Sequence, residues 1–450
     1  MSGLVGRLRV ALALPWTPIG RRRIGWGLLF RCGFLLWPIA KVYRHLFLRE
    51  VPLVAVTGSF GKTTATRAIQ ASLGLPAERH VLWNAGGFLP LALLRTRRGS
   101  RAGVLEVGIS VRGQMADYAR RLEPLATVVM SVGSEHLATL GSIEAIRDEK
   151  ANLVRVLPRQ GIAVLNGDDE NVLWMTTQTD ARIVTFGFGE GLDVRAEHVE
   201  LDASGRTRFR LLVEDAIHNV RIELVGRTAV YPILAAVAVS RVLGVPVEDA
   251  LSRLSSLPAA PERLEPFRAR NGALLLLDTS KSSLETIDVG MEALRAIPAE
   301  GKKVAILGDV EGPPGSQGPI YREVGRRLAS VVSQIVFVGG RKAYASVSGG
   351  ARERGLQAED LLYAGRDVRG VASLVEERIG PQDVVWLKGR STQHLGRIGL
   401  ALAGRNVSCN VTYCPVTPGC ATCPMLERRR GHGLRRRALH RRASRRKARS

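Results

Sequence analysis

The chain has 450 residues, 45% of them hydrophobic, which excludes a largely disordered protein and favours about two or three domains with buried cores. The formal charge of +24 is typical of nucleic-acid-binding proteins, but about half of it lies in the low-complexity tail at 428–450. We expect that tail to be a disordered arm, either without a specific role or attracted to anionic lipid or nucleic acid. The moderately basic remainder does not indicate a nucleic-acid partner.

The N-terminal region contains a long apolar segment, IGWGLLFRCGFLLWPIA at 24–40, which approaches the length of a membrane span but carries Arg31 in its middle. Basic residues stand on both sides of it, so the positive-inside rule gives no orientation for a span. They are Arg21, Arg22, Arg23, Lys41, Arg44 and Arg49. We therefore expect residues 1–50 to associate with the membrane as a peripheral or monotopic helix. A span and a buried or oligomer-forming helix are the alternatives.

A phosphate-binding loop is predicted after the first strand. VPLVAVT at 51–57 is typical of a buried strand, and GSFGKTTATRAIQASLG then begins a helical pattern. The glycines would let backbone amides converge on phosphate oxygens, Lys62 could reach the outer phosphates, and Thr63 could offer its hydroxyl to Mg²⁺. The sequence thus predicts ATP and Mg²⁺ as cofactors. The residues expected to hold the nucleotide here are Gly58, Ser59, Gly61, Lys62, Thr63 and Thr64.

The spacing GxxGKTT resembles the short phosphate loop T-G-(S/T)-x-G-K-(S/T)-(S/T) of the Mur ligase family. Four further segments are similar to family segments and occur in the family's order. They are WNAGGFLPLALL at 83–94, VLEVGIS at 104–110, PLATVVMSVGSEHLATLGSIEAIRDEKANLV at 124–154 and GIAVLNGDDENV at 161–172. Later apolar segments, among them ALLLLD, KKVAILG and DVVWLKG, are typical of strands in a second sheet.

The resemblance implies an α/β fold with two folded domains. A central phosphate-loop Mur ligase domain with a mostly parallel sheet would cover residues 51–265. A Rossmann-like C-terminal domain would cover residues 266–407. The three remaining segments would be the membrane-associating residues 1–50, a cysteine cluster at 408–427 and the basic tail at 428–450.

The resemblance also implies the metal-binding and nucleotide-binding residues. Glu106 and His136 each follow an apolar strand, at the edge where an open α/β sheet places its ligands, and with Thr63 they would bind Mg²⁺. Lys150 is expected to be carbamylated and to help hold a second Mg²⁺, and the alternative is an unmodified lysine on a solvated helix face. The residues expected to orient the nucleotide further along the chain are Asn166, Arg263 and Asp278.

The activity implied by the resemblance is that of an ATP-dependent ligase. ATP would phosphorylate a carboxylate, an amine would attack the acyl phosphate, and phosphate would leave, with catalysis resting on positioning and charge neutralisation. The expected substrates are a carboxylate-bearing precursor of the cell wall or of another polymer, and an amino acid, a dipeptide or ammonia. Lys388, in the segment KGRS, would stabilise charge unless it is a surface lysine at a strand end. The expected catalytic residues are Lys62, His136, Lys150 and Lys388.

Some features depart from the branch of the family that adds D-alanyl-D-alanine. LDTSKSSLETI stands where that branch has D-(D/S)-x-Y-N-A-N-P, and GDVEGPPG stands where it has G-D-M-x-E-L-G. Standard members also carry a uridine-binding domain ahead of the phosphate loop, where this chain has residues 1–50. We therefore expect a lipid-linked or polymeric carboxylate, used in the cytoplasm at the inner face of the membrane. Two alternatives remain: an amidating ligase with a glutaminase partner, and a non-catalytic ATP-binding protein tethered to the membrane.

Four of the five cysteines crowd together in SCNVTYCPVTPGCATCP, while Cys32 lies in the apolar segment and needs no role. The four thiols are close enough in sequence to bind one zinc ion or an iron–sulfur cluster, although their spacing fits no common motif. A structural zinc, reduced cysteines without a ligand, and a cluster or redox role all remain open. The candidate ligands are Cys409, Cys414, Cys420 and Cys423.

Overall fold

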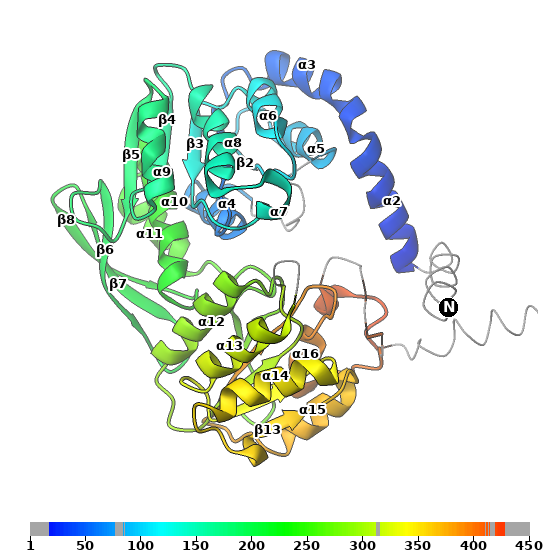
Figure 1. The fold of residues 1–450 in the computed structure, drawn as a ribbon. Coiled ribbons are helices and arrows are strands. Elements are labelled where there is room, and N and C mark those ends of the chain that lie inside the picture. Colours follow the sequence, from blue (N-terminus) through cyan, green and yellow to red (C-terminus); the bar gives the residue numbers. More distant parts are fainter. Residues whose placement is uncertain are drawn as a thin grey trace, which may run out of the picture. The chain divides into compact units, whose positions relative to one another are not determined.

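The computed structural model describes residues 18–76, 84, 86–311, 316–409, 411–412, 414 and 419–427. The chain forms two compact units, one from Gly27 to Pro258 and one from Ala259 onward that also includes the residues before Gly27 (Figure 1). The division falls a few residues before the boundary expected near 265. The predicted basic tail at 428–450 lies outside the described residues.

The first unit is built on an eight-stranded sheet in the order β2-β1-β3-β4-β5-β6-β7-β8. The strands from β1 to β6 pair in parallel, and β6, β7 and β8 pair antiparallel. All residues of β1 are buried, as expected for a parallel strand covered on both faces. The strands are β1 Leu53–Thr57, β2 Gly103–Glu106, β3 Ala126–Val129, β4 Ile162–Asn166, β5 Arg182–Gly187, β6 Val194–Leu201, β7 Thr207–Val213 and β8 Ala216–Ile222.

Helices α4 to α9 lie between successive strands of this sheet, whereas α10 and α11 follow its last strand. Helices α4, α10 and α11 pack together, and α6 packs with α8. The Ala-rich and Val-rich α10 is buried along most of its length, which explains why its sequence is apolar on every side. The helices are α4 Lys62–Ser72, α5 Phe88–Arg95, α6 Gln114–Leu122, α7 Leu137–Leu140, α8 Ile143–Arg155, α9 Glu170–Leu173, α10 Val230–Val242 and α11 Val247–Ser255, with short 3-10 turns η3 Trp174–Gln178 and η4 Arg227–Ala229.

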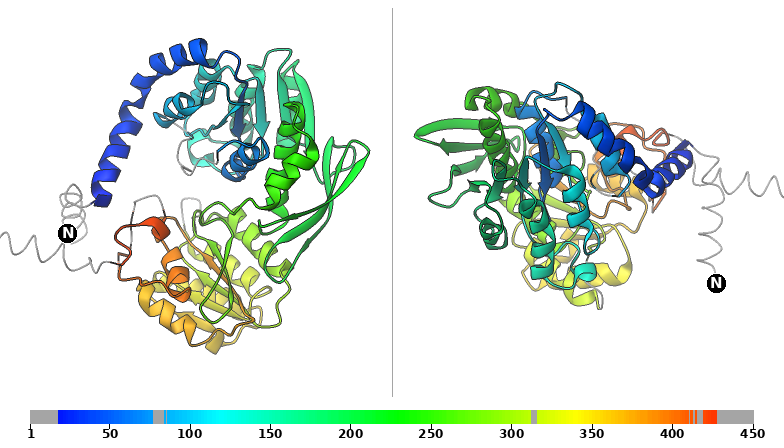
Figure 2. Two further views of the ribbon diagram at one scale, coloured as in Figure 1. Left: turned by 180° about the vertical axis from the view of Figure 1, so that it is seen from behind. Right: turned by 90° about the horizontal axis from the view of Figure 1, so that it is seen from above.

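The apolar N-terminal segment forms α2 Pro18–Cys32, a 3-10 turn η2 Gly33–Leu36 and α3 Trp37–Phe47. Helix α3, drawn in blue, runs along the outside of the first unit (Figure 1 and Figure 2). Helix α3 packs against α5, and the hydroxyl of Tyr43 donates to the carbonyl oxygen of Thr96 at 2.9 Å. Within the described part of the chain, no helix is both long and apolar enough to cross a bilayer.

Two glycines allow η2 to approach the segment before α5. A Cβ atom on Gly87 would lie 2.6 Å from the Cα of Gly33 and from the carbonyl oxygen of Leu29. We expect Gly87→Ala to lower the free energy of unfolding by about 1–3 kcal/mol, because backbone has to move. Urea unfolding measures this change. Gly27→Ala in α2 is the matched control, since its Cβ would meet nothing within 4 Å, and equal midpoints for the two variants would contradict the close approach.

The second unit is built on a six-stranded sheet in the order β13-β12-β11-β14-β10-β9, in which only β9 runs antiparallel. The predicted α/β fold class, with a Rossmann-like second domain, is therefore confirmed. The strands are β9 Glu265–Arg268, β10 Leu274–Asp278, β11 Lys303–Leu307, β12 Gln334–Phe337, β13 Leu361–Tyr363 and β14 Val384–Lys388. The helices are α12 Leu284–Ala296, α13 Gly318–Leu328, α14 Arg341–Arg352, α15 Val368–Glu376 and α16 Gly396–Leu402, with 3-10 turns η5 Ala358–Asp360 and η6 Cys420–Thr422.

Candidate functional site

The predicted phosphate loop joins β1 to α4 at the carboxyl edge of the first sheet. Gly58 and Gly61 have φ angles of 150° and 80°, which favour glycine, and the helix begins directly afterwards at Lys62. A Cβ atom on Gly58 would lie 2.9 Å from the Cβ of Met130, so the loop has no room for a side chain there. The loop thus presents backbone amides and a helix N-terminus, an arrangement that suits a phosphate group.

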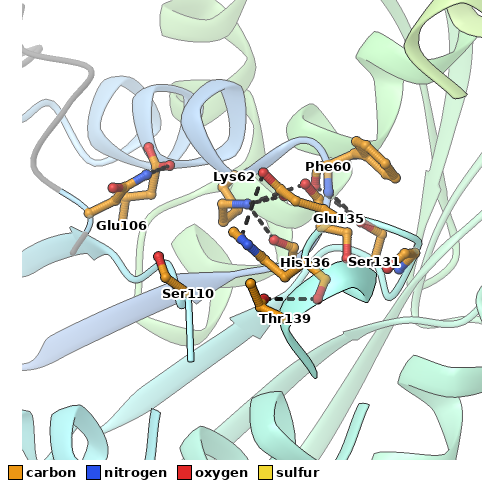
Figure 3. A network of polar contacts seen from close by, with 12 residues as sticks. Phe60, Lys62, Glu106, Ser110, Ser131, Glu135, His136 and Thr139 are labelled. Carbon is orange, nitrogen blue, oxygen red and sulfur yellow. Dashed lines mark hydrogen bonds and ion pairs between the residues drawn. The ribbon is translucent and has the colours of Figure 1, made fainter. Parts of the chain in front are cut away.

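Lys62 folds back over this loop. Its Nζ donates to the carbonyl oxygens of Gly58 at 2.5 Å and Ser59 at 3.2 Å, and it forms an ion pair with Oε2 of Glu135 at 3.1 Å. Figure 3 shows Lys62 pointing toward Glu135 and His136. Glu135 is not among the residues predicted from the sequence, and its place directly before His136 is the only signal that could have identified it.

Hydrogen bonds join the phosphate loop to the segment that follows β3. The N–H of Ser59 donates to the carbonyl oxygen of Ser131 at 2.9 Å, and the N–H of Phe60 donates to the Ser131 hydroxyl at 2.8 Å. The N–H of Gly133 donates to the Ser59 hydroxyl at 2.8 Å. Because these bonds already hold the loop in the folded chain, less conformational entropy remains to be lost when a ligand binds.

Glu106 and His136 lie at the same sheet edge as Lys62 (Figure 3). Glu106 ends β2, is half-buried, and accepts a hydrogen bond from Nδ2 of Asn84 at 3.0 Å. His136 precedes α7 with a φ of 71°, an uncommon backbone conformation for a residue other than glycine. Its Nε2 lies 3.9 Å from Oε1 of Glu135. The Glu135 carboxylate therefore lies beside the loop lysine, and Glu106 and His136 belong to the same edge of the sheet.

Lys150 lies on α8 and is only 2% exposed, so the alternative of a lysine on a solvated helix face is wrong. The neighbouring Glu149 is also buried. Its carboxylate accepts hydrogen bonds from the N–H groups of Gly113 at 3.0 Å and Met115 at 2.8 Å, at the start of α6. These bonds anchor α8 against α6 and hold the buried lysine in a fixed position.

Both polar atoms of the Asn166 side chain form hydrogen bonds with the backbone. Nδ2 donates to the carbonyl oxygen of Met130 at 2.9 Å, and Oδ1 accepts from the N–H of Asp168 at 3.1 Å. Asp168 in turn accepts from the N–H of Phe188 at 2.6 Å, and Asp169 caps α9. Asn166 thus connects the ends of β3 and β4, and a direct contact with a nucleotide would need an exchange of one of these partners.

In the second unit, Asp278 and Lys388 are register partners at the ends of β10 and β14. Nζ of Lys388 donates to Oδ2 of Asp278 at 2.7 Å, and Nε1 of Trp386 donates to the same oxygen at 3.4 Å. Lys388 is 1% exposed, so the alternative of a surface lysine is wrong. Burial lowers the pKa of Lys388, and the neighbouring Asp278 opposes that shift.

Further charged groups lie at the same edge of the second sheet. The positive charge of Arg263 contributes to the lowered pKa of Lys388, and Nε of Arg263 is buried with no hydrogen-bond partner among the described residues. Asp309 follows β11, and burial raises its pKa, against the opposing charges of Arg366 and Arg390. A buried donor without a partner is unusual in a folded protein, and it marks Arg263 as a group that a ligand could satisfy.

The four clustered cysteines are free thiols in the structure. Arg397 is fully buried, and its Nη1 donates to the carbonyl oxygen of Cys409 at 3.1 Å, which ties the segment to α16. Burial raises the pKa of the Cys420 and Cys423 thiols, which disfavours thiolates. Across the described ranges, no three or more His, Cys, Asp or Glu side chains are placed to hold a metal, so zinc, one of the three alternatives for Cys409, Cys414, Cys420 and Cys423, is not supported.

The predicted site residues therefore form two sets in two units. Lys62, Glu106 and His136 lie at one edge of the first sheet, and Thr63 stands in the first turn of α4, where its side chain is buried. Arg263, Asp278 and Lys388 lie in the second unit. The first set fits ATP and Mg²⁺, because it combines a glycine loop and a helix N-terminus for phosphate with the hydroxyl and carboxylate oxygens that Mg²⁺ prefers.

Comparison with known proteins agrees with this chemistry. The model of the Mur ligase middle domain matches residues 56–240. A UDP-N-acetylmuramoyl-tripeptide–D-alanyl-D-alanine ligase of Mycobacterium tuberculosis is 29% identical over 382 residues, covering 80% of this chain and 74% of the relative. Its counterpart from Bacillus subtilis is 27% identical over 311 residues, covering 68% of this chain and 66% of the relative.

Solved structures show the same fold. Crystal structure II of MurF from Acinetobacter baumannii has a TM-score of 0.73 at 23% identity, covering 83% of this chain and 81% of that one. A MurF ligase of Thermotoga maritima in complex with ADP has a TM-score of 0.69 at 24% identity, covering 82% and 83%. The curated relatives are ligases, and together with the phosphate loop they identify the chain as an ATP-dependent ligase that forms carbon–nitrogen bonds. The chain belongs to the Mur ligase family and is MurF-like.

Proposed function

We propose that this ligase activates a carboxylate as an acyl phosphate and joins it to an amine, in the synthesis of cell-wall or envelope polymer. The observation that supports the proposal is the position of Lys62, which lies on a glycine phosphate loop and beside the carboxylate of Glu135. A lysine placed there can neutralise the charge of a transferring phosphoryl group. His136 and Glu106 lie at the same sheet edge (Figure 3).

The proposed reaction has two steps. A carboxylate oxygen of the first substrate attacks the γ-phosphorus of ATP, the bond to the β-phosphate oxygen breaks, and ADP leaves. The nitrogen of the amine then attacks the acyl carbon, phosphate leaves with the bonding electrons, and the nitrogen loses a proton. Lys62 and the loop amides would hold the transferring group throughout, so that most of the rate enhancement comes from positioning and from charge neutralisation.

Mg²⁺ would neutralise charge on the phosphate oxygens when it is bound. We propose that Thr63, Glu106, His136 and carbamylated Lys150 hold it. In the second unit, the buried Lys388 would orient Asp278, and Arg263 would offer its unpartnered Nε to the nucleotide. Asn166 would act indirectly, by fixing the turn after β4.

We propose a muramoyl-peptide-like carboxylate and a short amine as substrates, since the similar proteins are named for a muramoyl tripeptide and D-alanyl-D-alanine. The segments LDTSKSSLETI and GDVEGPPG depart from the pattern of those relatives, which leaves room for a different amine. Ammonia in place of a dipeptide is the second candidate. The free thiols and the use of ATP suit the cytoplasm, and we place the reaction there, at the inner face of the membrane.

Phosphate release by the purified chain tests the ligase. ATP would be supplied with panels of amino acids, dipeptides and ammonia, and with nucleotide-linked and lipid-linked muramoyl peptides as carboxylates. We expect release only when one carboxylate and one amine are both present. Release that needs ammonia would establish the amidating reaction instead. ATP binding without release under any combination would reject the catalytic proposal in favour of a binding protein.

Carbamylation of Lys150 gives a separate test. A carbamate carries an anionic oxygen ligand, which arginine or alanine at this position cannot form. We expect Lys150→Arg to lower the rate of ligation about 10²-fold, as the loss of one charge-stabilising group does. The native chain incubated with ¹³C-bicarbonate should show a carbamate carbon signal by NMR that this variant lacks. Lys302→Arg, at an exposed position, is the control, and a native chain without the signal would contradict the proposal.

A further inference from the structure

Exposed apolar side chains follow the N-terminal helices. Thirteen large hydrophobic side chains are exposed among the described residues, and nine of them lie between Ile24 and Phe47. Six of these belong to the first unit and are each between 57% and 70% exposed. They are Leu28, Phe34, Leu35, Ile39, Val42 and Leu46, and we refer to them as the outer stripe.

The opposite side of these helices is already packed. Trp37, Ala40 and Leu48 are buried, and the hydroxyl of Tyr43 is bonded to the backbone of Thr96. On α3, Ile39, Val42 and Leu46 follow the spacing of a second, outward face. The helix therefore has two apolar faces, of which the fold of the first unit uses one. A contiguous exposed apolar patch of this kind is typical of a binding surface.

The charges within the segment that carries the outer stripe all have one sign up to Arg49. No Asp or Glu occurs before Glu50, and the first 49 residues contain nine Lys and Arg residues. Arg31, Lys41 and Arg49 are exposed, and they are distributed along the length of the helices instead of at one end. Apolar residues combined with basic residues along the same length are typical of a helix that lies in the plane of a membrane interface.

We propose that the outer stripe inserts into the surface of a bilayer that contains anionic phospholipid, with the helices parallel to the membrane plane. The long stems of Arg31, Lys41 and Arg49 would let their charges reach the headgroups while the stripe enters the acyl region. A second copy of the chain is a poorer partner, because two such surfaces would bring like charges together. This inference deepens the proposed location of the enzyme and does not need the ligase activity to be correct.

The helices that carry the outer stripe contact the segment next to the candidate site within the first unit. Gly33 of η2 lies directly against Gly87, and a Cβ atom on Gly86 would lie 2.5 Å from the ring of Phe30. The same short segment holds Asn84, which donates to Glu106. If the ligase acts as proposed, membrane docking would hold the edge that carries Glu106 close to the lipid surface, and the carboxylate substrate would be one carried on a lipid.

Vesicle co-sedimentation of the full-length protein tests the surface. The probes are vesicles of phosphatidylcholine alone and of phosphatidylcholine with phosphatidylglycerol, at low and at high salt. We expect tighter binding to the anionic vesicles. Leu46→Ser should weaken binding about ten-fold at both salt concentrations, since it removes one inserted side chain. Lys41→Gln should weaken binding about five-fold at low salt and little at high salt.

Ile217→Ser is the matched control, because Ile217 is a large hydrophobic residue of the same unit that is 63% exposed on β8. It should leave vesicle binding unchanged. High salt screens attraction through the basic tail at 428–450, so equal binding of Leu46→Ser and the native chain under that condition would overturn the proposal. Self-association that Leu46→Ser abolishes, without vesicle binding, would assign the stripe to a second copy. Vesicle binding without any substrate-dependent phosphate release would contradict the proposed ligase activity and leave the membrane proposal standing.

Discussion

Lys62→Ala should lower ATP-dependent ligation about 10²–10³-fold, which corresponds to about 2.7–4 kcal/mol of lost transition-state stabilisation. The native Nζ is held over the phosphate loop by two carbonyl oxygens and by Glu135, so it lies where the outer phosphates of a nucleotide would arrive. Alanine leaves the loop amides in place but removes the only formal positive charge that the loop itself carries. Phosphate release under saturating substrate measures the effect.

Lys342→Ala is the control for this experiment, since it removes an exposed lysine from α14. It should retain full activity. The unfolding midpoint of Lys62→Ala has to be measured beside the rate, because the Lys62 side chain is only 11% exposed and its loss removes the ion pair with Glu135. A variant that unfolds easily would leave the rate loss without a chemical interpretation, and a stable variant with more than a tenth of native activity would show that Lys62 is not central to catalysis.

Asp278→Ala should destabilise the second unit by about 3–5 kcal/mol, the usual cost of leaving one partner of a buried ion pair alone. Lys388 is fully buried, and its ammonium group has Asp278 within 2.7 Å. Replacing both residues, as Asp278→Leu with Lys388→Met, should cost much less, since no buried charge remains. Urea unfolding of the two variants gives the comparison, with Glu359→Ala, at an exposed position, as the control.

The pH dependence of this variant has a defined sign. Burial lowers the pKa of Lys388 in the folded chain below its ordinary value of 10.5, and without Asp278 that pKa falls further. Between the folded pKa and 10.5 the unfolded chain binds more protons, so stability rises with pH in that window. The deficit of Asp278→Ala relative to the native chain should shrink as the pH approaches 10.5. A deficit that grows with pH would contradict the assignment of a buried, unpaired lysine.

The fold could be predicted from the sequence because local pattern and long-range order agree. Each expected strand of the second sheet is apolar and bounded by polar turns, and the phosphate loop stands between a strand and a helix as its chemistry requires. The residues that end parallel strands, such as Glu106, could be placed at one edge because parallel strands share their carboxyl ends.

Burial could not be predicted in the same way. Lysine is ordinarily a surface residue, so the sequence does not show that Lys150 and Lys388 are buried. Segments that are distant in sequence pack around them. Glu135 partners Lys62 across a large sequence separation, which periodicity cannot reveal. Asn166 is predicted to orient the nucleotide, and the sequence does not reveal that both of its polar atoms bond to the backbone in the folded chain. The cysteines are close in sequence, but no three candidate ligands lie together among the described residues.

The ion pair between Lys62 and Glu135 means that the phosphate loop contains its own counter-ion. An anion that enters the loop has to displace a carboxylate that is already in place, so a weakly charged or singly anchored anion gains little by binding. A nucleoside triphosphate can displace the Glu135 carboxylate, because it contacts the loop amides, the helix N-terminus and the lysine together. Free phosphate makes fewer contacts with which to do so. The resting enzyme would therefore discriminate against the inorganic phosphate that the proposed reaction releases, and product inhibition at this loop would be weak.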